Sequence, residues 1–287
     1  MQVTQATRAT HATQAEKAER FKALHAADAG FIIPNPWDPG SARLLTSLGF
    51  QALATTSAGF AFSRGLPDGG ASRDMLMQHL AELSAATHLP ISADLLNGFG
   101  EQPDDVARSI IDAAQHGVVG GSIEDSTGKG GAPIMGLTQA VERVAAAVEA
   151  ARSLPFPFTL TARAENHFVG ISDLDDTIRR LLAFQEAGAD VLFAPGLARR
   201  EDIAQVLKAV DRPVNVLIGV PGMHLTVQDL LEMGVRRISV GGSLARVALG
   251  ALVSAAKELR DHGTTGYGQS AMPGAELNRL FASGPDA

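Results

Sequence analysis

The chain has 287 residues, of which 45% are hydrophobic and 19% charged, a balance typical of one large globular domain. Its 24 basic and 31 acidic residues give a formal net charge of −7 with no strongly basic segment, so nucleic acids and anionic membranes are excluded as expected partners. The chain has no cysteine, which excludes disulfides, thiolate metal sites and cysteine nucleophiles and favours a cytoplasmic location. No apolar run approaches the roughly 20 residues of a membrane span.

The first 20 residues are predicted to form a loose N-terminal tail that leads into a helix, and residues 21–287 a single domain. The segment from Met1 to Glu16 is rich in Ala, Thr and Gln and lacks the apolar stretch of a secretory signal. A mitochondrial transit peptide is the alternative, because acidic residues are absent before Glu16, although Arg8 is the only basic residue there.

From about residue 30 onward, short apolar runs alternate with longer amphipathic segments. The predicted strands are 31–33, 52–54, 90–93, 118–123, 158–162, 191–193, 214–218 and 238–240. The amphipathic helical patterns between them include 75–87, 104–116, 137–151 and 173–187. Continuous apolar strands separated by helices are typical of a parallel sheet covered by helices.

Glycines end several predicted helices just before the next strand, namely Gly49, Gly117, Gly188 and Gly234. This position favours glycine because the backbone there adopts the left-handed conformation. Eight strand–helix units without a GxGxxG motif predict a (β/α)8 TIM-type barrel, with a doubly wound sheet as the alternative. Beyond Val240, a long helix, a glycine-rich break and a final helical segment predict additional C-terminal helices.

Charged side chains stand where the predicted strands end, which is where barrel enzymes carry their catalytic groups. Asp94 and Glu124 end neighbouring strands, and carboxylate oxygens with retained waters are the usual protein ligands of Mg²⁺. Arg163 ends the next strand, and its planar guanidinium suits a substrate carboxylate. The alternatives are that an acid caps a helix, or that these side chains form internal salt bridges, which is compatible with binding.

Two loops add further candidates. Thr55, Thr56 and Ser57 follow the second strand and could donate hydrogen bonds to the same anion, or they simply form a tight loop. Lys129 lies in a loop with three glycines, which suggests a lid that brings the lysine to an anion, the alternative being an exposed loop. No lysine lies on a predicted strand, which argues against a Schiff-base mechanism. His167 is a weaker candidate for acid–base chemistry.

The chain resembles the isocitrate lyase/phosphoenolpyruvate mutase superfamily over roughly residues 20–260. The motifs that carry the resemblance are 38–43 (DPGSAR), 65–68 (GLPD), 92–100 (SADLLNGFG), 121–125 (GSIED), 161–166 (TARAEN) and 240–243 (VGGS). The resemblance implies a Mg²⁺-dependent enzyme that acts on 2-oxo acids or 2-hydroxy di- and tricarboxylates through an enolate. It also implies a homotetramer in which paired subunits exchange C-terminal helices.

The resemblance assigns roles to individual residues. It implies that Asp94 and Glu124 hold Mg²⁺, mostly through water, with Mn²⁺ as an alternative metal. It implies that Arg163 binds the substrate carboxylate and that Thr56 and Ser57 donate hydrogen bonds to it. The remaining candidates are Asp68 and Lys129 for catalysis, and Asp38 and Asn215 for substrate binding.

The chain also departs from the superfamily pattern. Ser92 stands where many members carry a first acid, and Leu96 where some carry a glutamate, so the metal site is poorer in carboxylates. The lyases for isocitrate and methylisocitrate use a cysteine that this chain lacks, and the phosphonopyruvate branch has an asparagine near the lid lysine that is missing after Lys129.

The chain therefore most resembles the members of the superfamily that lack this cysteine. They predict a lyase that cleaves or decarboxylates a small 2-oxo or 2-hydroxy carboxylic acid through a metal-stabilised enolate. Two alternatives are phosphonopyruvate mutase or hydrolase chemistry at a P–C bond, and a non-catalytic barrel that binds a carboxylate.

Overall fold

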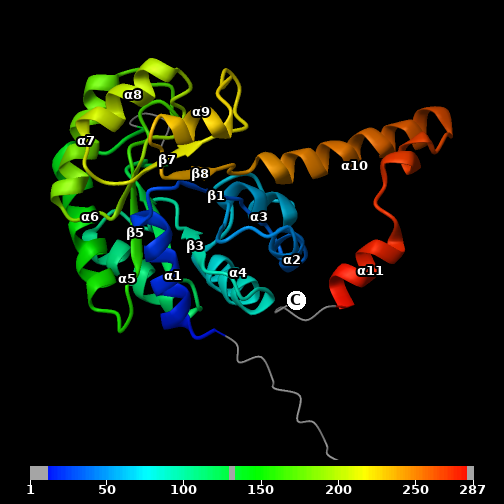
Figure 1. Cartoon of the computed structure of the whole chain (residues 1–287), viewed down its shortest axis with the longest axis horizontal. Helices are drawn as coiled ribbons and strands as arrows, with labels where there is room; N and C mark the ends of the chain where they lie inside the picture. Colours follow the sequence, from blue (N-terminus) through cyan, green and yellow to red (C-terminus); the bar gives the residue numbers. More distant parts are fainter. Residues whose placement is uncertain (1–11, 129–132, 283–287) are drawn as a thin grey trace, which may run out of the picture.

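Eight parallel strands form one sheet that curves into a barrel, with helices on its outside (Figure 1). This is a computed structural model, which describes residues 12–128 and 133–282. The strands are β1 (Phe31–Ile33), β2 (Leu53–Ala54), β3 (Ile91–Asp94), β4 (Gly120–Glu124), β5 (Thr159–Arg163), β6 (Val191–Phe193), β7 (Val214–Leu217) and β8 (Arg237–Ser239). Neighbours in sequence pair from β2 to β8, and β8 pairs with β1. The predicted (β/α)8 barrel is confirmed.

The seam between β1 and β2 is held by single contacts rather than by a ladder. The backbone N–H of Ala54 donates to the carbonyl of Pro34 at 3.1 Å. Asn35, just beyond β1, donates from Nδ2 to the carbonyl of Thr55 at 2.9 Å, and its Oδ1 accepts from the backbone N–H groups of Val240 and Gly241 at 3.0 and 2.8 Å. One buried amide thus ties the ends of β1, β2 and β8 together at the rim of the barrel.

The helices lie where the amphipathic patterns predicted them. They are α1 (Gln14–Ala26), α2 (Pro39–Ser47), α3 (Ser57–Ser63), α4 (Arg73–Ala86), α5 (Pro103–Gln115), α6 (Leu137–Arg152), α7 (Leu174–Glu186), α8 (Arg200–Ala209), α9 (Val227–Glu232), α10 (Ser243–His262) and α11 (Gly274–Ala282), with a 3₁₀ turn η1 (Gly266–Ser270). The four predicted cap glycines have φ angles of +83°, +91°, +101° and +97°, as left-handed caps require.

Helix α1 closes the end of the barrel where the strands begin. It starts at Gln14, inside the segment predicted to be tail, because Thr13 and Glu16 form a reciprocal capping box. Its buried Phe21 packs edge-on against Phe31 at the start of β1. A Cβ added to Gly120 at the start of β4 would lie 2.8 Å from the Phe21 ring, so the ring fills the space that this glycine leaves.

Helix α10 leaves the barrel as a projecting arm, and α11 returns toward α2 (Figure 1). Along the arm, Val247, Leu252 and Val253 are 70%, 64% and 51% exposed. Arg43 of α2 donates to the carbonyl of Phe281 of α11 at 2.8 Å, which fixes where α11 lies. The predicted C-terminal helices are therefore present. Within the described ranges, no helix is long and apolar enough to cross a membrane.

Candidate active site

A cavity of about 870 Å³ opens where the strands end, and its lining brings most of the predicted site residues together. Asp94, Glu124 and Arg163 are the last residues of three adjacent strands, β3, β4 and β5. The parallel register sets Glu124 directly beside Arg163. Because the strands end at one edge of the barrel, residues far apart in the sequence meet in one mouth.

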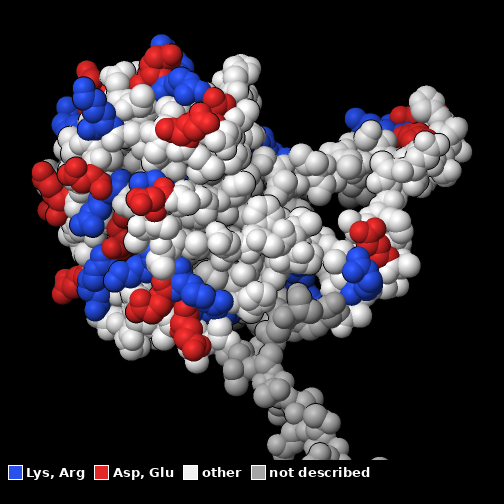
Figure 2. Space-filling view, in the orientation of Figure 1, with Lys and Arg blue, Asp and Glu red and all other residues white. Residues whose placement is uncertain are grey.

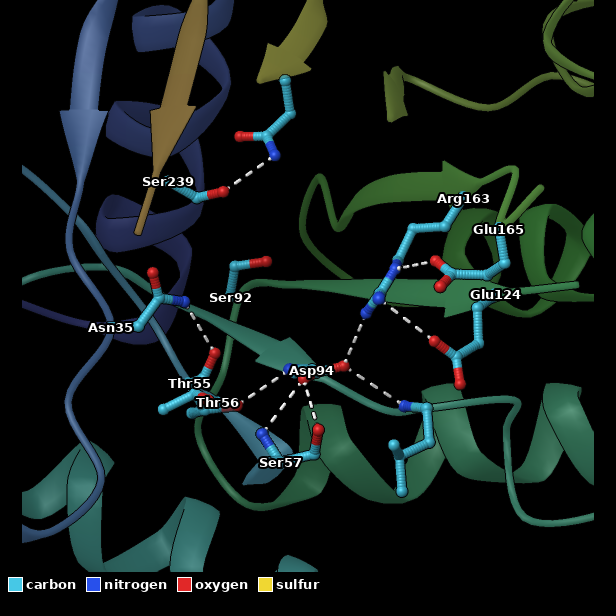
Figure 3. Close-up of polar contacts among 12 residues, drawn as sticks. Asn35, Thr55, Thr56, Ser57, Ser92, Asp94, Glu124, Arg163, Glu165 and Ser239 are labelled. Atoms are coloured by element: carbon cyan, nitrogen blue, oxygen red, sulfur yellow. Dashed lines mark hydrogen bonds and ion pairs between the residues drawn. The ribbon is translucent and has the colours of Figure 1, made fainter. Parts of the chain in front are cut away.

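Asp94 is held by donors on both of its carboxylate oxygens (Figure 3). Its Oδ2 accepts from the backbone N–H of Ser57 at 3.0 Å and from the Ser57 hydroxyl at 2.8 Å. Its Oδ1 accepts from Nη1 of Arg163 at 3.0 Å and from the N–H of Leu96 at 3.4 Å. Ser57, which also lines the cavity, therefore orients the acid in this structure.

Arg163 is the centre of a buried ion-pair cluster with three acids. Its guanidinium lies 3.0 Å from Asp94, 3.1 Å from Glu124 and 2.8 Å from Glu165. The guanidinium also lies over the ring of Phe193, 5.3 Å from its centre. Burial alone would lower the pKa of Arg163, but the three acids together raise it above its usual value. The internal salt bridges considered for this residue are thus present.

The cluster sets three carboxyl groups around one guanidinium. Burial raises the pKa of Glu124 to about 8, despite the opposing effect of Arg163. Burial likewise raises the pKa of Glu165. Burial, followed by the charge of Asp94, raises the pKa of Asp68 on the cavity wall. In each case burial is the largest cause, and the raised pKa means that these carboxyl groups hold a proton more firmly than exposed ones do.

The donor set fits Mg²⁺ in chemical type, since it consists of hard carboxylate oxygens beside a cavity. Within residues 12–128 and 133–282, no three or more His, Cys, Asp or Glu side chains are arranged to coordinate a metal by themselves. A cation held by Asp94 and Glu124 would therefore complete its coordination shell with water.

A second layer of charges supports the cluster from behind. Asp125 accepts from the backbone N–H of Glu165 at 2.8 Å and pairs with Nη1 of Arg180 at 3.0 Å. Nε of Arg180 also contacts Asp176 at 2.7 Å. Asp125 therefore holds loop backbone and fixes the position from which Glu165 reaches Arg163.

The other predicted site residues divide into two groups. Thr56 and Asn215 line the cavity, although the Thr56 hydroxyl accepts from the N–H of Gly59 as the cap of α3. Asp38 does not line the cavity, because its carboxylate caps α2 by accepting from the N–H of Ser41 at 2.6 Å. Lys129 lies outside the described residues.

Sequence reasoning missed Arg237, the first residue of β8. Its side chain is buried and lines the inner part of the cavity. Nη1 donates to the Thr161 hydroxyl at 3.0 Å, and Nη2 lies 3.5 Å from the Ser92 hydroxyl. The alternation of Arg237 and Ser239 around Ile238 was the available signal, because polar side chains two apart on a strand face the same side. The predicted strand began at residue 238 and so left the arginine out.

Comparisons with known proteins identify relatives along nearly the whole chain. The sequence model of the Phosphoenolpyruvate phosphomutase family matches residues 21–260. A probable 2-methylisocitrate lyase 2 of Corynebacterium glutamicum is 30% identical over 254 residues, covering 84% of this chain and 81% of the relative.

Solved structures agree with this family. A crystal structure described as a putative lyase/mutase from Burkholderia cenocepacia J2315 is 57% identical with a TM-score of 0.93, covering 95% of this chain and 98% of that one. An oxaloacetate acetylhydrolase in complex with its product oxalate is 27% identical with a TM-score of 0.84, covering 93% and 94% of the two chains.

Proposed function

The chain belongs to the phosphoenolpyruvate phosphomutase family, and on that premise we propose that it is a Mg²⁺-dependent lyase acting on a small 2-oxo or 2-hydroxy carboxylic acid. Lyase-type relatives support the class of reaction. The observation that carries the proposal is the meeting of Asp94, Glu124 and Arg163 in one cavity, where three carboxyl groups surround one guanidinium.

In this proposal, Asp94 and Glu124 hold the metal ion. When bound, Mg²⁺ supplies the positive charge that polarises the 2-oxo group of the substrate as a C–C bond breaks. Ser57 keeps Asp94 in a single orientation, because its two donors bind one carboxylate oxygen. Arg163, which lines the cavity, would bind the substrate carboxylate through the N–H groups of its planar guanidinium.

Proton transfer is assigned to residues on the cavity wall and in the lid. Asp68 lines the cavity, and burial raises the pKa of its carboxyl group, which is the direction that suits a proton donor. Lys129 stays a proposed donor from the loop after β4. The chain has no cysteine, so a reaction that needs a thiol as its acid is not proposed. Oxaloacetate and substituted malates are the preferred candidate substrates.

The projecting arm supports the proposal of a homotetramer with exchanged C-terminal helices. On the face shown in Figure 2, most of the arm's surface is uncharged, with charged side chains near its tip. If α10 packed on a second subunit, the exposed side chains of Val247, Leu252 and Val253 would be buried. Burying these apolar side chains would favour the assembly. Light scattering of the whole chain should give the mass of four subunits, and a monomer mass would contradict the proposal.

The test is a substrate panel assayed with and without Mg²⁺. Oxaloacetate, malate derivatives, methylisocitrate and phosphonopyruvate are incubated with wild type, with Asp94→Ala, and with Asp74→Ala as a matched control on the exposed surface. We expect Mg²⁺-dependent cleavage of a 2-oxo or 2-hydroxy acid by wild type and the control, and its loss in Asp94→Ala. Equal rates in all three proteins would refute the metal assignment, and turnover of phosphonopyruvate alone would indicate P–C chemistry.

A further inference from the structure

The inner part of the cavity holds a buried cation without a counter-ion. Arg237 is 4% exposed, and its hydrogen bonds go only to the hydroxyl groups of Thr161 and Ser92. Its Nε has no hydrogen-bond partner, and no carboxylate among the described residues pairs with it. Its guanidinium lies over the ring of Phe21, 5.8 Å from the ring centre, on the side of α1. A charge in this position is costly unless something pairs with it.

Other buried arginines of the chain are fully engaged. Arg163 contacts three acids, and Arg180 contacts two. Arg143 donates to the backbone carbonyls of Gly100 and Asn97. Arg237 differs from all three in that it contacts neither an acid nor a backbone carbonyl, but only hydroxyl groups, one of them at the limit of hydrogen-bond distance, beside a space large enough for a ligand.

The position of Arg237 relative to the acidic cluster is fixed by the strands. Ser92 precedes Asp94 by two residues on β3, and Thr161 precedes Arg163 by two residues on β5. Side chains two apart face the same side and lie about 6–7 Å apart along a strand. Arg237 bonds to the deeper member of each pair, so its guanidinium lies one layer below the acids and Arg163. A small dicarboxylate that lies along the barrel axis could therefore contact both layers.

Because residue 92 is a serine, the positive charge of Arg237 is left available to bind a ligand. By the superfamily resemblance, many members carry an acid there, and an acid at position 92 would face the guanidinium that Ser92 now contacts. The serine leaves Arg237 charged and unneutralised. The outer layer, with its acids and Arg163, therefore suits a metal cation together with one end of a substrate. The inner layer, with Arg237, suits a negatively charged group at the other end.

We propose that Arg237, with Thr161 and Ser92, binds the distal carboxylate of a dicarboxylate substrate whose 2-oxo or 2-hydroxy end lies at Asp94, Glu124 and Arg163. This inference rests on the proposed function and narrows it to dicarboxylates. The guanidinium has N–H groups free for a carboxylate, and the hydroxyls of Thr161 and Ser92 can hold it in place.

The experiment compares two 2-hydroxy acids that differ in the distal carboxylate, malate and lactate. Their dissociation constants are measured by calorimetry with Mg²⁺ for wild type, Arg237→Gln and Arg237→Lys. The matched control is Arg236→Gln, which removes the neighbouring arginine on the outside of the barrel, where its guanidinium contacts Asp28. Lyase turnover is measured on the same proteins.

Wild type and the Arg236→Gln control should bind malate more tightly than lactate. In Arg237→Gln, malate binding should weaken roughly 10- to 100-fold, the effect of losing a charged hydrogen-bond donor, while lactate binding stays unchanged. Arg237→Lys should keep part of the preference.

Equal weakening for both acids in Arg237→Gln, or no weakening for either, would overturn the proposal. If that variant does not fold, wild type and Arg237→Lys decide, because equal affinities of wild type for malate and lactate contradict a carboxylate subsite. Absence of lyase turnover with the malate preference intact would refute the proposed function alone. Turnover without the preference would refute only the role of Arg237.

Discussion

The two arginines of the barrel interior occupy opposite electrostatic surroundings. Arg163, in the outer layer, contacts three carboxylates and is held as the one cation of an acidic cluster. Arg237, in the inner layer, contacts hydroxyl groups, and burial followed by the charge of Arg163 lowers its pKa to about 10. The Arg163 side chain therefore stabilises the fold, whereas burying the Arg237 side chain lowers the free energy of unfolding.

A buried charge can be kept because it stabilises the fold or because it binds a ligand, and the two cases respond differently to mutation. Removing one partner of a buried ion pair leaves the others uncompensated, which is strongly destabilising, whereas an unpaired buried charge can be replaced by an apolar group at little cost. Arg163 meets the first description and Arg237 the second. Stability measurements on variants at both positions can therefore test this contrast without any knowledge of the substrate.

The largest effect is expected at Arg163. Arg163→Gln leaves Asp94, Glu124 and Glu165 buried without their cation, and we expect the free energy of unfolding to fall by about 3–5 kcal/mol. Urea unfolding at neutral pH measures this. Arg200→Gln, which breaks an exposed pair with Asp229, is the control and should change stability by less than about 1 kcal/mol. Similar losses in both variants would show that the cluster does not depend on Arg163.

An intermediate effect is expected at His25, in α1 next to Phe21. Burial, followed by the charge of Arg237, lowers the pKa of His25 to about 3, so the folded protein keeps this ring neutral. An unfolded chain would protonate it below about 6.5. Stability is therefore complete above pH 6.5 and falls as the pH decreases toward 3, by about 2 kcal/mol at pH 5.

The measurement for His25 is urea unfolding at pH 7 and pH 5 in wild type and His25→Gln. The variant should lose less stability between these two pH values than wild type does, whatever its stability at pH 7. His79→Gln is a useful comparison, because burial lowers the pKa of His79 to about 4 at a site away from Arg237. If wild type and His25→Gln lose the same amount of stability, the ring is not buried in its neutral form.

The smallest effect is expected at Arg237. Arg237→Met keeps the packing against Phe21 and removes an unpaired charge, so we expect the free energy of unfolding to change by less than about 1 kcal/mol or to rise. The measurement is the same urea unfolding as for Arg163→Gln. A loss as large as that of the Arg163 variant would show that the hydroxyls of Thr161 and Ser92 satisfy the guanidinium in the absence of a ligand.

Much of the fold could be predicted because the signals are local. The apolar runs 31–33 and 191–193 coincide with β1 and β6, and the four cap glycines have the backbone angles expected of them. The start of α1 was not foreseen, because an Ala- and Thr-rich segment has no apolar periodicity. Its helix depends on the capping box at Thr13 and on packing against the barrel, and the second of these is a tertiary effect.

The site was partly predictable for a similar reason. Strand ends identified Asp94, Glu124 and Arg163, since a parallel barrel gathers its strand ends at one edge. Asp38 was assigned to the substrate, but its carboxylate caps α2. A sequence motif cannot distinguish a cap from a ligand contact. Arg237 was missed because its importance depends on the residues of β3 and β5 that face it across the barrel.

The most direct test of the account is a calorimetric titration of oxalate, with and without Mg²⁺, into wild type, Asp94→Ala and the surface control Asp74→Ala. The oxaloacetate acetylhydrolase relative is described in complex with oxalate, which makes oxalate a suitable probe of the outer layer. We predict tight binding to wild type and the control only when Mg²⁺ is present, and its loss in Asp94→Ala. Oxalate binding that is equally tight without Mg²⁺, or unchanged by Asp94→Ala, would contradict the proposed metal-dependent active site.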